Sequence, residues 1–516
     1  MSDPTNVLFI VIDQLRADCV SGALAEHVAM PNIRAFAADA VSFSHHFSVT
    51  NPCGPSRASI LTGLYAMNHR SVRNGTPLSD GLTNLALEMR AHGYNPELFG
   101  YTDTSRDPRG KSPDDPVLHN YEEVLPGFTE IIQMRPDSGN AAWQKYLKDK
   151  GYDLPSYDDF YIPVPPVAGQ APYPDDPAFY RAEDSDTAFL TDAFLAHNRA
   201  NPTPGWFALL TYIRPHPPLV APEPYNKMYT PADMPLPERM ATTKAEEAVH
   251  PMLAAQRQRP PMEAAVDGCW GQISAGVDAD IRLMRALYFG LITEVDLHVG
   301  RVIEHLKQTG QYENTKIILT ADHGEMLGDH HMWGKSHVYD PAYRVPLIIR
   351  DPACRDTNGT TVSHLTESVD ITPTILDLAG RSVPGSMDGR SLRPFLSANV
   401  PENWRDAVHL ELDLGEPIQA TAVQRKCKLD LHDANLAILR EAEFKLVHFN
   451  GGLPPLLFDL KNDPTEMHNL ADDPAHMPTL LRLTQKLLSH RMRHMDRTLS
   501  DLTITSDGVI GEIPAL

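Results

Sequence analysis

Two pairs of polar residues stand directly after short apolar runs, far apart in the chain. Asp13-Gln14 ends the run in "NVLFIVIDQ", and Asp322-His323 follows "KIILTA". Ligands of an open α/β sheet bind outside the carboxyl ends of its strands, so we expect the two pairs to meet there. Carboxylate and amide oxygens with one imidazole suit one divalent cation, such as Ca²⁺, Mn²⁺ or Mg²⁺. Taken singly, each pair could equally be an ordinary strand-end turn.

A cysteine stands in an unusual setting in "NPCGPSRASILTG", residues 51–63. Cys53 precedes Pro55 by two residues and Arg57 by four. A chance Cys-x-Pro-Ser-Arg in a chain of this length has odds of roughly a few in a thousand. The plain structural alternative is a small buried apolar side chain before a tight proline turn. The spacing therefore marks Cys53 and Arg57 as candidates for chemistry.

The elements that must position these residues can be read from the apolar pattern. The runs before both polar pairs are typical of buried parallel strands. A long helix is predicted over 281–308, where leucine and valine recur at four-residue spacing and Gly310 follows as a C-terminal cap. A second helix should begin at Thr372, with Pro373 in its first turn. Helices that alternate with such strands indicate an α/β fold with a doubly wound sheet.

Two long stretches rich in proline and tyrosine interrupt this pattern, at 103–186 and 221–261. We interpret both as ordered excursions that cover the ligand-binding edge of the sheet. A composition shift near Leu396 divides the chain into a catalytic α/β domain, 1–396, and a small C-terminal α+β subdomain, 397–516.

Within the subdomain, short antiparallel strands are predicted in 435–449 and 455–464, followed by a last helix over 478–494. The tail from Asp496 has no apolar stripe of its own. We expect it to pack on a neighbouring subunit.

The bulk composition excludes several classes of protein. A net charge of −22 over 516 residues argues against a nucleic-acid partner, and local cations or a metal would have to attract an anionic substrate. The five cysteines form no Cys-x-x-Cys pair, which indicates neither a disulfide framework nor a zinc knuckle. No basic amino-terminal region, signal-peptide core or membrane-length window is present. We therefore expect a cytoplasmic protein that contacts no membrane.

The text around Cys53 resembles the Cys-x-Pro-Ser-Arg signature of type I sulfatases, within the alkaline phosphatase superfamily. Further segments stand in the order of that family: "VLFIVIDQLRAD", "RPHPP", "TADHGEMLGDHH", "YRVPLII", "DITPTILDLAG" and "LFDLKNDPTEMHNLA". The metal pairs resemble those of the phosphonate monoester hydrolase branch, whereas many sulfatases carry Asp-Asp and Asp-Asn. The resemblance covers nearly the whole chain. It implies an alkaline-phosphatase-like doubly wound sheet with helices on both faces, plus a smaller C-terminal α+β domain.

The resemblance also implies that a formylglycine-generating enzyme oxidises Cys53 to formylglycine. A thiol would give a stable covalent product, whereas the hydrated aldehyde carries two hydroxyls on one carbon. One hydroxyl can attack sulfur or phosphorus, and loss of the proton from the other then expels the group. Arg57 would hold the formylglycine oxygen and offset local negative charge. The implied metal ligands are Asp13, Gln14, Cys53, Asp322 and His323.

Four further site residues are implied by the same resemblance. His216 in "IRPHPPL" and Lys335 in "MWGKSHVYD" would bind the non-bridging oxygens of the substrate or assist the leaving group. Asn74 in "VRNGTP" and Tyr101 in "FGYTDT" match neutral hydrogen-bond donors of the phosphonate hydrolase branch. Tyr101 stands where ordinary sulfatases carry a lysine, which favours that branch.

Two positions depart from the branch pattern. Asp103 replaces a threonine run and should repel an anionic substrate, above all a doubly charged one. Ser336 and His337 follow Lys335 where the branch has apolar and glycine residues, and His337 adds a candidate acid near the leaving group. Both changes indicate an altered specificity.

The main hypothesis is a metal- and formylglycine-dependent hydrolase of small, singly charged esters. Sulfate monoesters would be preferred, as in arylsulfatases, with phosphonate monoesters and phosphodiesters cleaved beside them. The alternative makes phosphonate monoester and phosphodiester hydrolysis the main activity. Two further hypotheses are a metal-dependent phosphodiesterase or mutase with unmodified Cys53, and a non-catalytic binding protein, which the intact site residues disfavour. The acidic surface and unassigned tail predict a homo-oligomer, a dimer or tetramer.

Overall fold

The apolar run after the amino terminus forms the central strand of the main sheet, β1 (Asn6–Ile12). The computed structural model describes residues 5–135, 139–256, 260–496, 499–500 and 502–510. β1 pairs in parallel with β6 (Phe207–Tyr212) on one side and with β7 (Thr315–Thr320) on the other. Both neighbours cover its edges and helices cover its faces, so every residue of β1 is buried and the strand shows no alternation. The strands predicted before Asp13 and Asp322 are confirmed.

Five more strands complete a mixed sheet in the order β5-β4-β6-β1-β7-β8-β2-β9. β4 (Pro96–Gly100) and β5 (Thr129–Gln133) extend the parallel half. On the other side, β8 (Leu347–Arg350) runs antiparallel to β7, β2 (Val41–Phe43) runs antiparallel to β8, and β9 (Thr361–Val362) closes the edge. The predicted doubly wound arrangement is confirmed for the strands around the centre, while one edge carries antiparallel neighbours.

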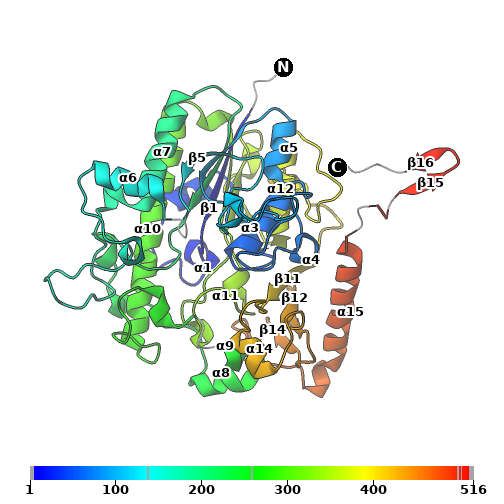
Figure 1. Ribbon diagram of the computed structural model, residues 1–516. Helices are drawn as coiled ribbons and strands as arrows, with labels where there is room; N and C mark the ends of the chain where they lie inside the picture. The colour runs from blue at the N-terminus through cyan, green and yellow to red at the C-terminus, as the bar shows by residue number, and fades with distance from the viewer. Residues whose placement is uncertain (1–4, 136–138, 257–259, 497–498, 501, 511–516) are drawn as a thin grey trace.

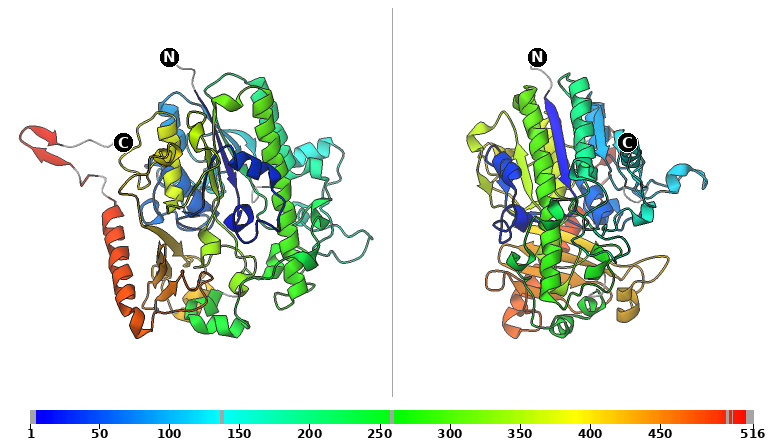
Figure 2. Two further views of the ribbon diagram at one scale, coloured as in Figure 1. Left: turned by 180° about the vertical axis from the view of Figure 1, so that it is seen from behind. Right: turned by 90° about the vertical axis from the view of Figure 1, so that its left-hand side faces the viewer.

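Helices cover both faces of this sheet (Figures 1 and 2). One face carries α2 (Pro31–Ala37), α7 (Asp186–Ala200) and α10 (Asp278–Gln308). The other face carries α3 (Cys53–Thr62), α5 (Leu85–Ala91) and α12 (Ile371–Leu378). The predicted helix at 281–308 and the helix predicted at Thr372 are therefore confirmed, each with a start within a few residues of its prediction.

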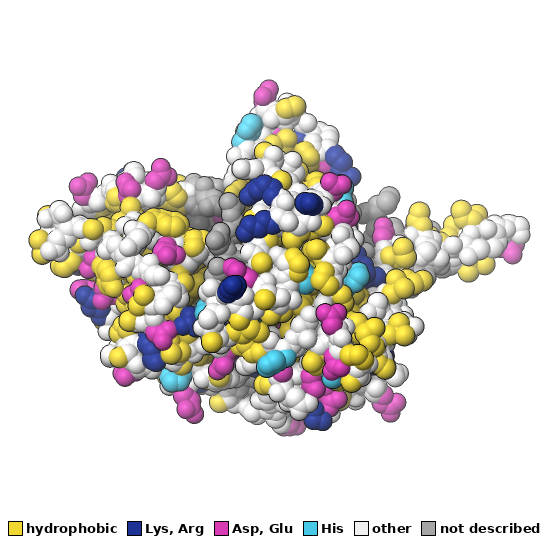
Figure 3. All heavy atoms as spheres, turned by 90° about the horizontal axis from the view of Figure 1, so that it is seen from below, with side chains coloured by type: hydrophobic (Ala, Val, Ile, Leu, Met, Phe, Trp, Pro, Cys, Tyr) yellow, Lys and Arg dark blue, Asp and Glu magenta, His cyan; other side chains and the backbone are white. Residues whose placement is uncertain are grey.

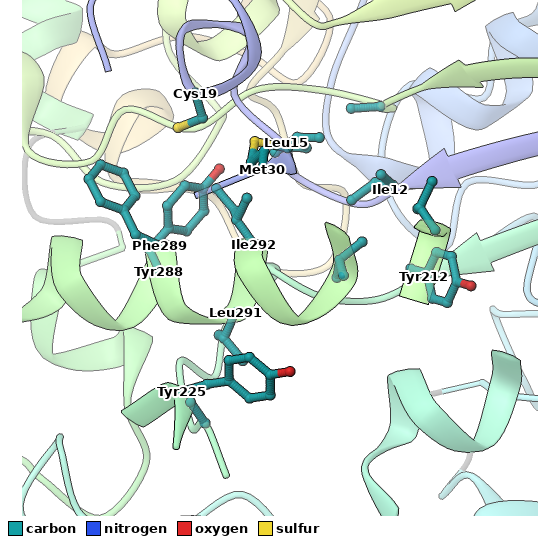
Figure 4. Packing of buried hydrophobic residues seen from close by; sticks show 14 of the residues in the cluster. Ile12, Leu15, Cys19, Met30, Tyr212, Tyr225, Tyr288, Phe289, Leu291 and Ile292 are labelled. Carbon is teal, nitrogen blue, oxygen red and sulfur yellow. The ribbon is translucent and has the colours of Figure 1, made fainter. Parts of the chain in front are cut away.

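Helix α10 shows how the apolar stripe of the sequence is used. Its inward face packs on the sheet and on the loop after β1, where Tyr288 and Ile292 lie close to Leu15 and Met30 (Figure 4). The helix ends at Gln308, and Gly310 just beyond it has a left-handed φ of +70°. A side chain at this position would strain the backbone, which is why a glycine terminates the helix well.

The two proline-rich excursions are ordered, as predicted, but they do more than cover an edge. The first contributes the edge strand β5 and the helix α6 (Ala141–Asp149). The second contains α8 (Thr243–Val249) and α9 (Pro251–Gln256). Residues 136–138 and 257–259 of these excursions lie outside the described residues. The five residues of β5, TEIIQ, are all half-buried and show no alternation, so the sequence did not predict a strand there.

The C-terminal part forms a four-stranded antiparallel sheet, which confirms the strands predicted there. It runs in the order β11 (Ala407–Asp413), β12 (Asn435–Glu441), β13 (Phe444–Phe449) and β14 (Leu456–Asp459). The predicted last helix is α15 (Met477–His494), and Leu483 and Leu487 pack on this sheet. The division of the chain at residue 396 stays a prediction.

Beyond α15, a short hairpin of β15 (Thr503–Thr505) and β16 (Gly508–Ile510) projects away from the body of the molecule (Figures 1 and 3). Its side chains are exposed, Ile504 to 84%. The outer face of α15 also exposes large apolar side chains, among them Leu488 and Met492. That the tail packs on a neighbouring subunit stays a prediction. Within the described residues, every helix is too short or too polar to cross a bilayer.

Three histidines fasten α15 to the sheet it covers. His490 stacks between His409 and His494 with ring centroids 4.4 Å apart on each side, and Tyr65 meets the three rings edge-on. Burial lowers the pKa of His409 to about 3. Burial also lowers the pKa of His490, and the neighbouring His409 adds to the effect. His409 and His490 are therefore neutral imidazoles near pH 7.

We expect the protein to lose stability as the pH falls from 7.5 to 5. A histidine whose pKa is about 6.5 in the unfolded chain takes up a proton there first, so protonation favours unfolding over this range. At pH 5 His409 alone should cost about 2 kcal/mol, from 1.36 kcal/mol per pKa unit. Urea unfolding at the two pH values measures the effect. His409→Phe should reduce the difference, while the exposed His468→Gln should not; an unchanged difference in His409→Phe would contradict this account.

Candidate active site

The two polar pairs meet at the carboxyl ends of neighbouring strands, as predicted. Asp13 follows β1 and Asp322 follows β7, and these strands are hydrogen-bonded to each other. Ligand atoms of Asp13, Asp322, His323 and Cys53 all lie within 4.8 Å of one another, and all four residues are buried. Gln14 joins them through its backbone N–H, which donates to Asp322 Oδ1 at 3.1 Å. The sheet therefore brings together residues three hundred positions apart.

Arg57 bridges the two carboxylates from α3. Its Nε donates to Asp322 Oδ2 at 2.9 Å, and its Nη2 donates to Asp13 Oδ2 at 3.1 Å. Burial would raise the pKa of Asp322, but His323 and Arg57 hold it well below its ordinary value. The pKa of Asp13 is instead raised, by burial and by the Asp322 carboxylate. Arg57 therefore holds the two carboxylates and offsets their negative charge, while its predicted contact with a formylglycine oxygen stays a prediction.

His323 is fixed in one tautomer. Its Nδ1 lies 3.1 Å from the carbonyl oxygen of Gly324, so this nitrogen carries the proton and donates. The lone pair of Nε2 then faces the cluster, 3.1 Å from Cys53 Sγ. Burial lowers the pKa of His323 to about 4, so the ring stays neutral near pH 7. A neutral imidazole with a free Nε2 is the form that ligates metals.

Cys53 opens helix α3 at the centre of the cluster. Its Sγ lies 3.8 Å from Asp13 Oδ1 and accepts a hydrogen bond from Lys335 Nζ at 3.2 Å. Burial raises the pKa of the Cys53 thiol well above its ordinary value, and Asp13 adds to the rise. The site as it stands does not favour a thiolate, which argues against a thiol nucleophile.

Lys335 links the cluster to a second loop. Its Nζ donates to Gln14 Oε1 at 2.8 Å and lies 2.7 Å from His216 Nε2. Burial works against the charged Lys335, but Asp13 and Asp322 raise its pKa above the ordinary value. Burial and Lys335 lower the pKa of His216 well below its ordinary value, so the pair consists of an ammonium donor and a neutral imidazole.

Asn74 and Tyr101 both border the cluster, with different roles. The Asn74 carbonyl oxygen accepts the backbone N–H of Gly54 at 3.0 Å, and the residue is exposed, which leaves its amide N–H₂ as a donor. The Tyr101 hydroxyl is buried, donates to Asp13 Oδ2 at 2.5 Å and accepts from Arg57 Nη2 at 2.9 Å. Tyr101 was predicted as a neutral hydrogen-bond donor, and in this structure its hydroxyl donates to the Asp13 carboxylate.

The two departures from the branch pattern, Asp103 and His337, are both buried side chains. Asp103 lies on the turn after β4 with a left-handed φ of +50°, and it is 6% exposed. Burial raises its pKa well above the ordinary value, and Glu122 adds to the rise although Arg57 opposes it. His337 is buried, and its Nε2 donates to the carbonyl oxygen of Trp333 at 3.0 Å. Neither side chain is exposed, and the predicted effect of Asp103 and His337 on specificity stays a prediction.

Two family models match the sequence of this chain. The sulfatase family model matches residues 5–381, well over half of the chain. A model of the C-terminal region of N-sulphoglucosamine sulphohydrolase matches residues 328–493. The chain belongs to the sulfatase family.

Within this family, the chain is 54% identical to phosphonate monoester hydrolase SpPMH from Silicibacter pomeroyi, with a TM-score of 0.95 over 98% of this chain and 99% of that one. Its identity to the phosphonate monoester hydrolase of Agrobacterium radiobacter is 42%, with a TM-score of 0.92 over 99% and 100% of the two chains. The multifunctional alkaline phosphatase superfamily protein PehA from Trinickia caryophylli is 38% identical over 98% of both chains. An arylsulfatase from Clostridium perfringens is 27% identical over 90% of both chains. This sulfatase-family protein is a hydrolase of sulfate or phosphonate esters.

The residues present fit the divalent cation that the family implies. Two carboxylates, the Gln14 amide oxygen and His323 Nε2 are donors that Ca²⁺, Mn²⁺ or Mg²⁺ accepts. Burial and the neighbouring Asp322 raise the pKa of Asp13, and a cation held between the two carboxylates would favour their charged forms. An oxygen in place of Cys53 Sγ would complete a set of hard ligands around such an ion.

Two positioning residues of this sulfatase-family site were not predicted from the sequence. Glu325 accepts a hydrogen bond from Gln14 Nε2, and Arg214 holds the loop of His216 by donating to the carbonyl oxygens of His216 and Pro218. Arg214 is buried and pairs with Asp186 at 3.0 Å. Glu325 lies two residues after His323, and Arg214 lies two residues before His216. Their closeness to these motif residues is the sequence feature that could have identified them.

We expect Asp322→Ala to weaken Mn²⁺ binding by at least about 100-fold, because loss of a direct ligand should exceed the 10–100-fold cost of an outer-shell change. The variant also leaves Arg57 with one carboxylate partner, so the local charge becomes more positive. Equilibrium dialysis with metal analysis measures the affinity. Asp296→Ala, on helix α10, removes an equally buried carboxylate away from the cluster and should bind as the wild type does. Retained Mn²⁺ affinity in Asp322→Ala would place the cation elsewhere.

Proposed function

We propose that the protein is a phosphonate monoester hydrolase and phosphodiesterase that uses one divalent cation and a formylglycine at position 53, with sulfate monoesters as secondary substrates. The observation that carries the proposal is the place of Cys53, at the start of α3 between His323 Nε2, Asp13 and Lys335 Nζ. The similarity to two phosphonate monoester hydrolases over nearly the whole chain supports it.

Two sequence features had favoured sulfate as the preferred substrate, and the structure weakens both. Asp103 was expected to repel anions, but its carboxyl is buried, and burial raises its pKa and so disfavours the charged form. His337 was expected to act as an acid near the leaving group, but its ring donates to a backbone carbonyl. The branch that carries Tyr101 and Gln14 therefore supplies the better hypothesis.

Formylglycine at position 53 accounts for a cysteine that the site would leave unreactive. Burial and Asp13 oppose the thiolate, so the thiol itself lacks an activating partner other than Lys335. A hydrated aldehyde at position 53 would supply one hydroxyl to attack phosphorus or sulfur, with the alcohol as leaving group, and a second hydroxyl whose deprotonation would expel the bound group and regenerate the aldehyde. A formylglycine-generating enzyme is therefore the partner that maturation requires.

The surrounding residues have separate roles in binding the cation, positioning the carboxylates and contacting the substrate. A divalent cation held by Asp13, Asp322, His323 and Gln14 would withdraw charge from the reacting oxygens. Arg57 keeps both carboxylates in place, and its charge is committed to them. Lys335 is then the side-chain cation that meets the substrate: the N–H that it donates to Cys53 Sγ in this structure would turn to a non-bridging oxygen or protonate the leaving oxygen. His216 orients Lys335 as a neutral acceptor.

We expect the tryptic peptide that contains Cys53 to be about 18 Da lighter than its sequence mass when active protein is prepared with a formylglycine-generating enzyme, because oxidation to the aldehyde replaces the thiol. Mass spectrometry of the digest measures this difference. The peptide that contains Cys269 is the internal control and should keep its sequence mass. Full activity in protein whose Cys53 peptide has its unmodified mass would support the metal-dependent phosphodiesterase or mutase hypothesis instead.

We expect kcat/KM for a phosphonate monoester and for a phosphodiester to exceed that for a sulfate monoester, and a phosphate monoester to be the poorest substrate. The first three esters carry one negative charge, whereas a phosphate monoester carries nearly two. The second charge increases its repulsion by the Asp13 and Asp322 carboxylates, and only Lys335 and the divalent cation offset that repulsion. Rates on 4-nitrophenyl esters of the four classes measure the order. A sulfate monoester cleaved fastest would restore the arylsulfatase hypothesis, and a phosphate monoester cleaved fastest would contradict the charge argument.

A further inference from the structure

Glu325 is a buried carboxylate that contacts two parts of the site at once. It is 3% exposed and lies at the start of a loop that ends at Gly334, directly before Lys335. Its Oε1 accepts the backbone N–H of Leu327 at 2.9 Å and that of Gly334 at 2.7 Å. Its Oε2 accepts Gln14 Nε2. One side chain thus closes the loop and holds the amide of Gln14.

The three contacts identify the charge state that this environment fits. All three partners are N–H donors, and a carboxylate anion accepts hydrogen bonds at both oxygens without donating any. A protonated carboxyl or an amide would place a donor against a donor. Glu325 therefore also fixes which way the Gln14 amide points, since its Nε2 must face Glu325 and its Oε1 must face away.

The opposite side of Gln14 shows what that orientation achieves. Gln14 Oε1 accepts Lys335 Nζ at 2.8 Å, and the same ammonium donates to Cys53 Sγ. Gln14 has a left-handed φ of +64°, which is costly for a residue other than glycine and is held by hydrogen bonds of its backbone N–H to Asp322 and of its carbonyl oxygen to Tyr288. Backbone and side chain are both constrained.

We propose that Glu325 is the positioning residue that turns the Gln14 amide oxygen and the Lys335 ammonium toward Cys53, and that its carboxylate is the reason why position 14 carries an amide. The proposal depends on the proposed function in one respect: it takes Gln14 Oε1 as a ligand of the proposed divalent cation. Glu325 touches no reacting atom, because both its oxygens are occupied by N–H groups of the chain.

Exchange of the two side chains tests this assignment. In Glu325→Gln, the new amide must accept the N–H groups of Leu327 and Gly334, so its own N–H₂ meets that of Gln14. The Gln14 amide then turns over and presents N–H₂ to the cation site. The Gln14→Glu/Glu325→Gln double variant restores the pairing with its direction reversed, since the amide introduced at position 325 donates to a carboxylate at position 14.

We expect Glu325→Gln to weaken Mn²⁺ binding at least about tenfold, as removal of an outer-shell partner usually does. The double variant should bind Mn²⁺ more tightly than Glu325→Gln, because the carboxylate at position 14 again presents an oxygen to the cation and adds a ligand charge. Glu294→Gln makes the same change at an equally buried carboxyl on α10 and should not alter binding. Wild-type affinity in Glu325→Gln, or equal losses in the single and double variants, would overturn the proposal.

Thermal unfolding of the metal-free proteins supplies a readout that does not depend on catalysis. Glu325→Gln should lower the Tm, and the double variant should recover most of the loss. If the single variant does not fold, recovery of folding by the double variant supports the pairing, and failure of both overturns it. A wild type that binds no Mn²⁺ and cleaves no phosphonate ester would contradict the proposed function. The Tm values would still decide whether Glu325 pairs with Gln14 as proposed.

Discussion

The structure depends above all on one electrostatic constraint, two buried carboxylates that face each other at the ends of neighbouring strands. Asp13 and Asp322 would repel each other in a site from which water is largely excluded. The guanidinium of Arg57 spans both carboxylates, and its rigid fork matches that geometry as an ammonium would not. Helix α3 must therefore lie against this edge of the sheet, which places Cys53, four residues earlier, in the centre of the site.

Around this centre, loops are held by charged side chains that never meet a ligand. Arg214 ties down the backbone on both sides of Pro217 while it pairs with Asp186. Glu325 closes the turn that leads to Lys335. Proline-rich loops carry few regular hydrogen bonds of their own, so such clamps supply the rigidity that helices and strands provide elsewhere. Lys335 and His216 can then meet although they approach from different parts of the chain.

Much of this arrangement could be predicted from the sequence, because apolar periodicity and local motifs report on local structure. The strands before Asp13 and Asp322 and the long helix α10 all follow such patterns. Contacts between distant segments leave no comparable trace. The commitment of the Tyr101 hydroxyl to Asp13 and the burial of Asp103 depend on how the turn after β4 folds against α3. Strand β5 was missed because its pairing with β4, and not its composition, makes it a strand.

The depth of Cys53 sets a limit on the order of events during biosynthesis. All ten residues of α3 are buried, and Cys53 itself is 5% exposed. A processing enzyme could reach Cys53 in the folded protein only if α3, which also carries Arg57, unwound. The proposed conversion of Cys53 would therefore have to precede the folding of this segment. Molecules in which α3 folds before Cys53 is converted would keep an unmodified cysteine and remain inactive.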